Sequence, residues 1–300
     1  MNFVRKVRNY IFFHAVYAGL FNSWDDERFI RLLFKRNVGY EPDLDNPKTF
    51  NEKMQWLKLH DRKPEYTAMV DKYEAKRIIA EKVGEQYVIP TLGVWDKVED
   101  IDFDSLPTQF VLKTTHDCGG VVICKDKASF DIAAAKKKLS EHMKVNYYYT
   151  SREWPYKNAK PRIIAEELLS DDDGSPLEEY NLFCSFGEPL FSMHCYGDKL
   201  QGGIRYNDYY MLNGERMPLK WGNETMPSAT FQQFDAYSDM IEKAKRLSKE
   251  MAFLRVDFYL VDGKAVLGEL TMYNWGGVMP IEPPEWDRKL GDLIQLPTTQ

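Results

Sequence analysis

The residues best suited to hold a metal lie in two short apolar segments near the C-terminus, at 254–258 (LRVDF) and 267–271 (LGELT). Carboxylates inside apolar strands cost free energy unless their charge is paired. Mg²⁺ usually takes one or two protein carboxylates together with phosphate oxygens. Asp257 and Glu269 are therefore candidate Mg²⁺ ligands. The alternative is an ion pair between Arg255 and Glu269 with no metal.

Both carboxylates must lie on one face of a hairpin to share an ion. The dipeptide Asp262-Gly263 marks the turn of that hairpin. With a two-residue loop, Asp257 lies opposite Gly268, and Glu269 points to the other face. A three-residue loop, or a β-bulge in one strand, brings both carboxylates to the same face. The metal site therefore requires one of these two devices.

A second group of residues suits phosphate. Lys113 ends an apolar segment, and Gly119-Gly120 open a turn into the next one. Backbone N–H groups at such a turn face phosphate oxygens, and the lysine adds a point charge. A tight turn with no ligand is the alternative.

The segment 162–169 (RIIAEELL) is an apolar strand that ends in two acids and two leucines. Its end fits the edge of an adenine pocket, where backbone groups bond the ring and an acid accepts from a ribose hydroxyl. A core strand that runs into a polar loop is the alternative.

Two further motifs are weaker. Asp171 to Asp173, followed by a glycine, resemble the acidic metal motif of nucleotide-sugar glycosyltransferases, but such runs are more often solvated turns. The trio His116-Asp117-Cys118 contains a thiol and a base. Contiguous residues rarely place nucleophile and base correctly, because the partners are usually distant in sequence.

The elements that must position these residues change character along the chain. The first 83 residues predict helices, including a capping box at Thr49–Glu52 and a helix at 66–83. Strands and two hairpins follow, together with helices at 130–144 and 231–251. This order favours an α+β fold with mainly antiparallel sheets. The sequence contains no G-x-G-x-x-G fingerprint and no P-loop motif.

The composition excludes some function classes. The net charge is −6, which argues against nonspecific nucleic-acid binding. Four cysteines without a C-x-x-C pair in a chain of 300 residues indicate a reduced, cytoplasmic setting.

The N-terminus carries Arg5, Lys6 and Arg8 before an apolar run that is too short to span a bilayer. One helical face, with Val7 and Ile11 at its centre, is expected to pack on the domain. An interfacial helix at the inner face of the membrane is the alternative.

Taken in order, these motifs resemble the ATP-grasp superfamily, in the TupA-like branch associated with teichuronopeptide and surface-polysaccharide biosynthesis. The resemblance covers about residues 45 to 297. Its carriers are 50–53 (FNEK), Gln55-Trp56, 71–73 (DKY), 110–113 (FVLK), His116-Asp117, Gly119-Gly120, 152–157 (REWPYK), 160–166 (KPRIIAE), 255–259 (RVDFY), 268–271 (GELT) and 285–287 (EWD).

The resemblance implies an ATP-grasp fold, in which two α+β subdomains grip ATP between mainly antiparallel sheets. It implies four parts: a helical region at 1–65, a helix–strand lead-in at 66–108 with the first nucleotide lysine, a small subdomain at 109–165, and a large subdomain at 166–300 with the metal site.

The resemblance also implies roles for single residues. ATP contacts are Lys72, Lys113, Gly119, Gly120, Glu166, Glu167, Leu168, Leu169 and Glu179. Asp257 and Glu269 bind one or two Mg²⁺ ions, and Arg255 is the catalytic cation. The substrate-side residues are Arg205, Thr271, Asn274, Gly276 and Gly277. Thr271 and Asn181 depart from the family pattern, which often has asparagine and lysine there, so a second metal is in question.

The implied activity is an ADP-forming carboxylate–amine ligase that works through an acyl phosphate, in surface polysaccharide, capsule or glycan-peptide biosynthesis. The substrates are then a small-molecule or glycan carboxylate and an amine. A kinase on the same fold and a nucleotide-sugar glycosyltransferase acting on a surface glycan are the alternatives.

Overall fold

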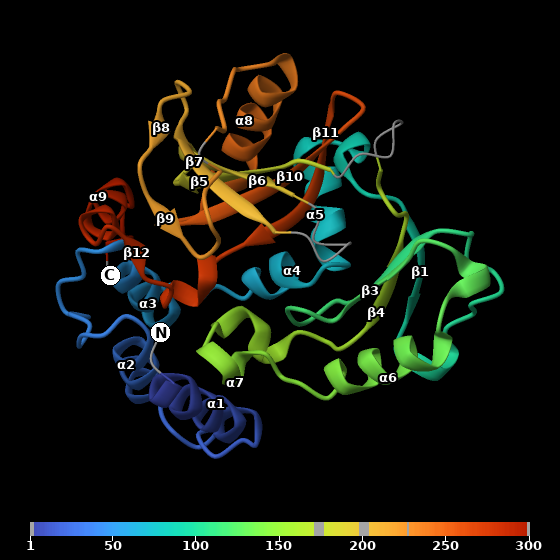
Figure 1. The fold of residues 1–300 in the computed structure, drawn as a ribbon, viewed down its shortest axis with the longest axis horizontal. Coiled ribbons are helices and arrows are strands. Elements are labelled where there is room, and N and C mark those ends of the chain that lie inside the picture. The colour runs from blue at the N-terminus through green and yellow to red at the C-terminus, as the bar shows by residue number, and fades with distance from the viewer. Residues whose placement is uncertain (1–2, 171–176, 198–203, 227, 299–300) are drawn as a thin grey trace.

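Two antiparallel sheets form the body of the protein. The computed structural model describes residues 3–170, 177–197, 204–226 and 228–298, so Asp171 to Asp173 lie outside the described residues. The six-stranded sheet lies at the upper left of Figure 1, and the four-stranded sheet lies at the right. The described strand pairs are antiparallel, which confirms the predicted α+β class.

The helices are α1 (Phe3–Tyr17), α2 (Asp26–Asn37), α3 (Phe50–His60), α4 (Tyr66–Val70), α5 (Glu74–Val83), α6 (Ile132–His142), α7 (Tyr148–Ser151), α8 (Asp235–Ser248) and α9 (Glu285–Leu293). The four-stranded sheet has the order β1 (Thr91–Trp95), β4 (Ile163–Glu166), β2 (Phe110–Thr114), β3 (Val121–Cys124). The six-stranded sheet has the order β11 (Lys264–Thr271), β10 (Leu254–Val261), β5 (Glu179–Ser185), β6 (Glu188–Tyr196), β7 (Tyr206–Met211), β8 (Arg216–Met217). Strands β9 (Lys220–Trp221) and β12 (Ile281–Glu282) pair with each other.

Helix α3 begins with the predicted capping box. The Thr49 side chain accepts from the Glu52 backbone N–H, and Glu52 accepts in return from the Thr49 backbone N–H. Reciprocal capping of this kind satisfies backbone donors that the helix itself cannot pair. It fixes the start of the helix whose later residues reach the site.

The predicted helix at 66–83 is wrong in one respect, because the chain forms two helices with a break at Asp71–Tyr73. The Asp71 carboxylate accepts from the backbone N–H groups of Tyr73 and Glu74, which caps α5 separately. The Lys72 backbone N–H leaves the helix and donates to the Thr115 carbonyl oxygen at 3.0 Å. The break turns Lys72 toward the four-stranded sheet.

Helix α1 forms as predicted, but the expected packing face is wrong. Phe12 and Val16 are 8% and 4% exposed, whereas Val7 and Ile11 are 41% and 62% exposed. The larger ring of Phe12 packs in a cluster with Phe29 of α2, which is why that face turns inward. The face with Val7 and Ile11 is left in solvent.

The large sheet separates an apolar face from a polar one. Leu254, Val256 and Phe258 of β10 are fully buried in the main hydrophobic cluster, which includes residues of α8. Side chains alternate along a strand, so Arg255 and Asp257 point the other way. The polar face of this sheet carries the predicted metal site.

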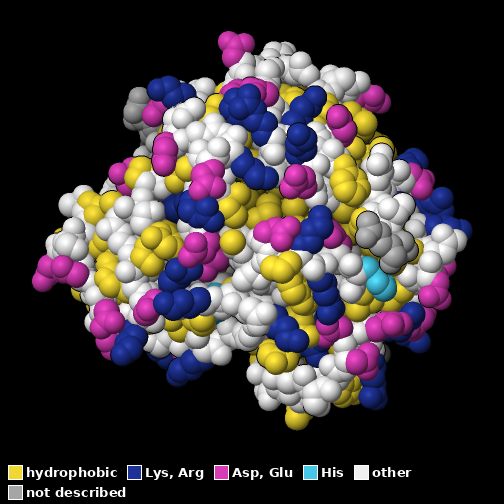
Figure 2. Space-filling view, turned by 180° about the vertical axis from the view of Figure 1, so that it is seen from behind, with side chains coloured by type: hydrophobic (Ala, Val, Ile, Leu, Met, Phe, Trp, Pro, Cys, Tyr) yellow, Lys and Arg dark blue, Asp and Glu magenta, His cyan; other side chains and the backbone are white. Residues whose placement is uncertain are grey.

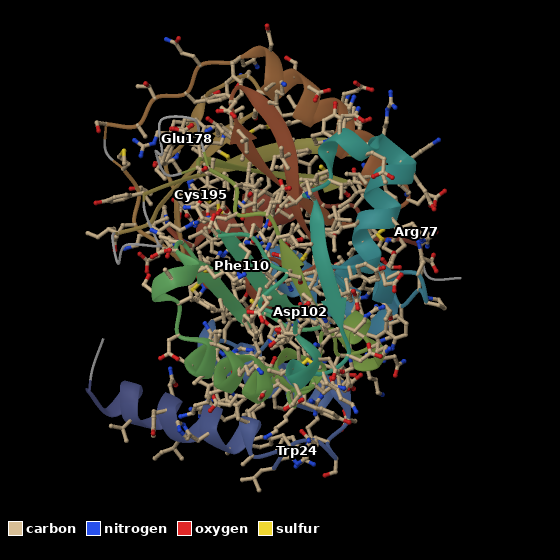
Figure 3. The ribbon with its side chains drawn as sticks, turned by 90° about the vertical axis from the view of Figure 1, so that its right-hand side faces the viewer. Trp24, Arg77, Asp102, Phe110, Glu178 and Cys195 are labelled. Atoms are coloured by element: carbon tan, nitrogen blue, oxygen red, sulfur yellow. The ribbon has the colours of Figure 1, made fainter. Side chains whose placement is uncertain are left out.

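The small sheet has its own core. Phe110 and Leu112 of β2 pack with Ile163 and Ala165 of β4 and with Leu139 of α6, and Phe110 lies inside the molecule in Figure 3. Lys113 stands on the opposite face of β2 from these residues.

Seen from behind, basic and acidic side chains are interspersed over the surface, and neither charge dominates that face (Figure 2).

Candidate active site between the two sheets

Asp257 and Glu269 lie directly opposite each other on β10 and β11. The loop has only two residues, because Val261 pairs with Lys264, so the three-residue loop does not form. The register instead shifts between Asp257 and Phe258, since Phe258 pairs with Leu267. This is a bulge at Gly268, and it brings Glu269 onto the face of Asp257. The second of the two required devices is therefore present.

Arg255 holds the Asp257 carboxylate from the same face. Its Nε and Nη2 donate to the two carboxylate oxygens at 2.7 and 2.5 Å. Nη2 also donates to Thr271 Oγ1 at 3.1 Å, and Nη1 donates to Asn274 Oδ1. Burial raises the pKa of Asp257 to about 6, although the guanidinium opposes that shift.

The donor set around Asp257 consists of hard oxygens. Asn181 of β5 lies opposite Asp257 on the other side of β10, and its buried Oδ1 has no hydrogen-bond partner among the described residues. The described residues contain no cluster of three or more His, Cys, Asp or Glu side chains that could hold a metal. Two carboxylates plus one amide oxygen fit a cation that completes its shell with phosphate and water oxygens. In the sequence, Asn181 stood out only as a position where the family often has lysine.

Lys113 and Glu166 meet on the facing small sheet. Lys113 Nζ lies 2.5 Å from Glu166 Oε2, and Lys76 Nζ of α5 lies 2.7 Å from Oε1. Burial raises the pKa of Glu166, but the two lysines outweigh it and hold the pKa below its ordinary value. Lys76 was missed in the sequence, because only the fold brings α5 to the end of β4.

Lys72 contacts residues on both sides of the site, next to the small sheet and on the large sheet. Its Nζ donates to the Asp117 carbonyl oxygen at 2.6 Å and lies 3.6 Å from Glu269 Oε1. One pocket is lined by residues of both halves: Met69, Val70, Lys72, Ala75, Lys76, Ile79, Val88, Ile89, Glu166, Leu267, Gly268, Glu269 and Leu270. The pocket has apolar walls and charged groups from each sheet.

The glycine turn between β2 and β3 is tightly braced. A Cβ atom on Gly120 would lie 1.7 Å from Thr114 Oγ1, and Gly119 has a φ of +97°. Thr114 donates to one oxygen of Asp117, and His142 of α6 bonds the other. Both glycines are required by this geometry. Neither ring nitrogen of His116 forms a hydrogen bond with Cys118, so the histidine does not activate the thiol.

The segment after β4 follows the pocket edge. The Glu167 backbone N–H donates to the Pro90 carbonyl oxygen at 3.3 Å, and Leu168 and Leu169 are half-buried. Further along, Glu179 pairs with Arg205 on the polar face of the large sheet. Arg205 thus lies beside the predicted ribose acid.

Asn274, Gly276 and Gly277 belong to the short 3-10 segment η6 (Asn274–Gly277) that follows β11. The Gly276 carbonyl oxygen accepts from Lys58 at 2.6 Å, and that of Gly277 accepts from Gln55 at 2.6 Å. Their backbones therefore face α3, and only Asn274 reaches the metal face, through Arg255.

Comparisons with known proteins identify the family. The family model described as TupA-like ATPgrasp matches residues 52–295. A comparison with curated protein sequences found no match.

Many solved structures are similar in fold. The ATP-grasp ligase PsnB complexed with minimal precursor is 10% identical over 70% of this chain and 54% of that chain, with a TM-score of 0.39. D-alanine–D-alanine ligase from Bacillus anthracis complexed with ATP is 17% identical over 68% and 55%, with a TM-score of 0.38. D-cycloserine synthetase DcsG is 14% identical over 76% and 71%, with a TM-score of 0.39. The chain thus spans just over half the length of the first two proteins.

Proposed function

Because the chain belongs to the TupA-like ATP-grasp family, we propose that it is an ATP- and Mg²⁺-dependent carboxylate–amine ligase. The family match also confirms the predicted ATP-grasp fold. The observation that carries the proposal is the Asp257–Glu269 pair on one face of β10 and β11, with Lys72 only 3.6 Å from Glu269. Glu269 and Lys72 both line the pocket between the two sheets.

On the small-sheet side, Lys72 and Lys113 bind the phosphates of ATP, and Gly119-Gly120 cover them. Glu166 to Leu169 form the adenine edge, and Glu179 accepts from the ribose. Lys72 and Glu166 line the pocket, which has apolar walls at Val88, Ile89 and Leu267. Such a lining suits a flat base with a charged tail.

On the large-sheet side, Asp257 and Glu269 hold Mg²⁺, and Asn181 adds an amide oxygen. A Mg²⁺ ion held by these residues would supply positive charge that offsets the charge of the phosphates. Arg255 stabilises the charge of the transferring phosphoryl group. Thr271 donates to Asp257 and accepts from Arg255, so its hydroxyl is engaged within the protein. One Mg²⁺ ion therefore fits better than two.

The chemistry has two steps. A substrate carboxylate oxygen attacks the γ-phosphorus of ATP, ADP leaves, and an acyl phosphate forms. An amine then attacks the acyl carbon, the C–O bond to phosphate breaks, and the amide forms. In the domain division that we propose, the lead-in at 66–108 contributes Lys72 and the small subdomain at 109–165 contributes Lys113 to the phosphates, while the large subdomain at 166–300 holds the metal.

The test is ADP formation by the purified protein with Mg²⁺, ATP, a panel of uronic and amino acids as carboxylates, and amino acids as amines. The family association leads us to place these substrates in surface-glycan assembly. The expected result is ADP release that requires both a carboxylate and an amine. A stable phosphorylated product with no amine requirement identifies a kinase, and UDP-sugar binding with indifference to ATP identifies a glycosyltransferase. Either result contradicts the ligase.

We also propose that α1 binds the anionic inner face of the membrane. None of the described helices is long and apolar enough to cross a membrane. Six of the large apolar side chains exposed in the described residues fall between positions 7 and 20, at Val7, Tyr10, Ile11, Phe13, Tyr17 and Leu20. Residues 1–24 contain three basic residues and no Asp or Glu, in a chain of net charge −6. An apolar helix face with basic residues suits an anionic interface.

Helix α1 lies along one edge of the molecule, at the bottom of Figure 3 beside Trp24. Vesicle sedimentation tests the proposal, with anionic phosphatidylglycerol vesicles and neutral phosphatidylcholine vesicles. We expect Ile11→Glu to lower binding to anionic vesicles at least fivefold, because a charge enters the apolar face. Ile132→Glu, at an isoleucine of α6 that is 40% exposed, is the matched control. Equal loss in both variants, or no wild-type binding, would sink the proposal.

A further inference from the structure

Two loops with strained backbone face each other beside β10 and β11, the strands that carry Asp257 and Glu269. Arg152, between α7 and the 3-10 segment η4 (Trp154–Asn158), has a φ of +57° although it is not glycine. Trp275 and Gly276, just after β11, have φ values of +51° and +60°. Left-handed backbone at non-glycine residues is unfavourable and persists where the surroundings enforce it, often at functional sites.

A buried lysine joins these loops. Lys58 of α3 is fully buried, and its Nζ donates to the carbonyl oxygens of Ser151 at 2.9 Å and Gly276 at 2.6 Å. Its third donor goes to Gln55 Oε1 at 3.0 Å. All three donors of the ammonium are therefore used to hold the loops together, and Lys58 has none left for a ligand.

Glu153 sits between the two loops. It is 5% exposed, and one of its carboxylate oxygens, Oε1, accepts from Ser151 Oγ at 2.7 Å. Among the residues that the structure describes, no hydrogen bond or ion pair engages its other oxygen. A Cβ atom on Gly276 would lie 3.4 Å from Oε1, so the glycine keeps the opposite loop close to the carboxylate.

The position of Glu153 connects to the metal site through contacts. Gly276 adjoins Glu153, and Asn274 of the same short segment accepts from Arg255, which holds Asp257. Burial raises the pKa of Glu153, Lys58 opposes this, and Glu269 raises it further.

Aromatic rings stand beside Glu153. Tyr147 and Tyr156 form an edge-to-face pair with centroids 5.0 Å apart. The charge of Glu153 raises the pKa of the Tyr147 hydroxyl, and burial adds to that effect. Trp275 is 39% exposed at the same loop. Within the described part of the chain, this corner combines apolar ring surfaces with a carboxylate oxygen that has no hydrogen-bond partner, while the nearby Lys58 already uses all three of its donors.

We propose that Glu153 receives the acceptor amine and removes its proton. The inference rests on the proposed ligase function and names the class of its second substrate, a primary amine that arrives as an ammonium ion. One N–H proton passes to the Glu153 carboxylate, and the nitrogen lone pair attacks the acyl carbon. The C–O bond to phosphate breaks with its electron pair on phosphate. A second N–H proton leaves with the phosphate, and Glu153 returns its proton to water.

The test separates the two half-reactions with Glu153→Gln, which keeps the shape of the side chain and an oxygen for Ser151. Acyl phosphate formation is read by hydroxylamine trapping, since hydroxylamine is neutral at neutral pH and needs no carboxylate to deprotonate it. Amide formation is read with amino acids as amines and the uronic and amino acids named above as carboxylates. We expect hydroxamate formation to stay within threefold of wild type and amide formation to fall at least 100-fold.

Each outcome is decisive. Parallel loss of hydroxamate and amide in Glu153→Gln would make Glu153 a structural residue and overturn the inference, as would an unchanged rate of amide formation. Ser151→Ala keeps the carboxylate and is expected to slow amide formation by less than tenfold. Glu282→Gln, at an exposed glutamate of β12, is expected to change neither rate. If the wild-type protein forms no hydroxamate with any carboxylate, the proposed function fails, and this inference falls with it.

Discussion

The two sides of the site carry charged groups of opposite sign. The small-sheet side presents Lys113 of β2 and Lys76 of α5, and the buried carboxylate of Glu166, 2.5 and 2.7 Å from them, offsets part of their positive charge. The large sheet presents carboxylates, and Arg255 balances Asp257 with two hydrogen bonds. Lys72 and Glu269 meet across the gap at 3.6 Å.

The difference shows how each half is prepared for its share of one ligand. A cationic wall matches phosphate, and a carboxylate wall matches a divalent cation that travels with phosphate. Each wall keeps its charges paired within the protein, which limits the cost of holding them in a pocket. Changes on the two walls should therefore have different consequences.

The largest effect is expected on the carboxylate wall. Asp257→Asn or Glu269→Gln removes a formal charge from the proposed Mg²⁺ site, and we expect kcat to fall by about 1000-fold or more, on the scale of losing preorganised electrostatic stabilisation. Steady-state ADP release measures this loss, with Glu282→Gln as a control at an exposed position. Wild-type rates in both variants would remove the metal assignment.

On the cationic wall, Glu166→Gln is expected to act mainly on stability. It leaves two lysines around a neutral amide, and breaking a buried ion pair costs roughly 3 kcal/mol or more. The pKa of Glu166 is held below its ordinary value, so its contribution is present at neutral pH and is lost as the pH falls through that lowered value. Urea unfolding at several pH values measures this. A stability gap between wild type and variant that persists in strong acid would contradict the account.

Lys72→Met is expected to have a smaller effect, on ATP binding. It removes one point charge from the phosphate contacts, and we expect affinity for ATP to fall about 10-fold to 100-fold, since a charge-assisted hydrogen bond contributes about 1.5–3 kcal/mol. Calorimetry with a non-hydrolysable ATP analogue measures the change. Lys82→Met, at an exposed residue of α5, is the matched control. Equal affinities in Lys72→Met and wild type would show that Lys72 serves only the break between α4 and α5.

The smallest effect is expected at Asn181, which lies beside Asp257 on the carboxylate wall. Asn181→Ala removes a neutral oxygen beside Asp257, and we expect Mg²⁺ affinity to fall about tenfold, the lower end of losses at supporting metal contacts. Titration of ADP release with Mg²⁺ measures it. An unchanged Mg²⁺ dependence would limit the donor set to the two carboxylates.

Local chemistry explains which features the sequence predicts. The capping box at Thr49–Glu52 and the hairpin turn at Asp262-Gly263 depend on neighbouring residues, and both form as predicted. The sequence allowed either a longer loop or a bulge, and only the pairing of the strands selects the bulge at Gly268. The site thus required the register of β10 and β11 in addition to the motif.

Features that depend on distant contacts were missed. The break at Asp71 forms because Lys72 bonds Thr115, which is far along the chain. The role of Lys76 depends on β4 ending beside α5. The buried face of α1 is set by the packing of Phe12 against α2, although helical periodicity alone favoured the face with Ile11.

The most direct test of the account is Mg²⁺-dependent nucleotide binding at the Asp257–Glu269 pair. Calorimetry with a non-hydrolysable ATP analogue, with and without Mg²⁺, compares wild type with Asp257→Asn combined with Glu269→Gln. The account predicts that Mg²⁺ tightens binding at least tenfold in wild type and has no effect in the double variant. An equal gain from Mg²⁺ in both proteins would contradict it.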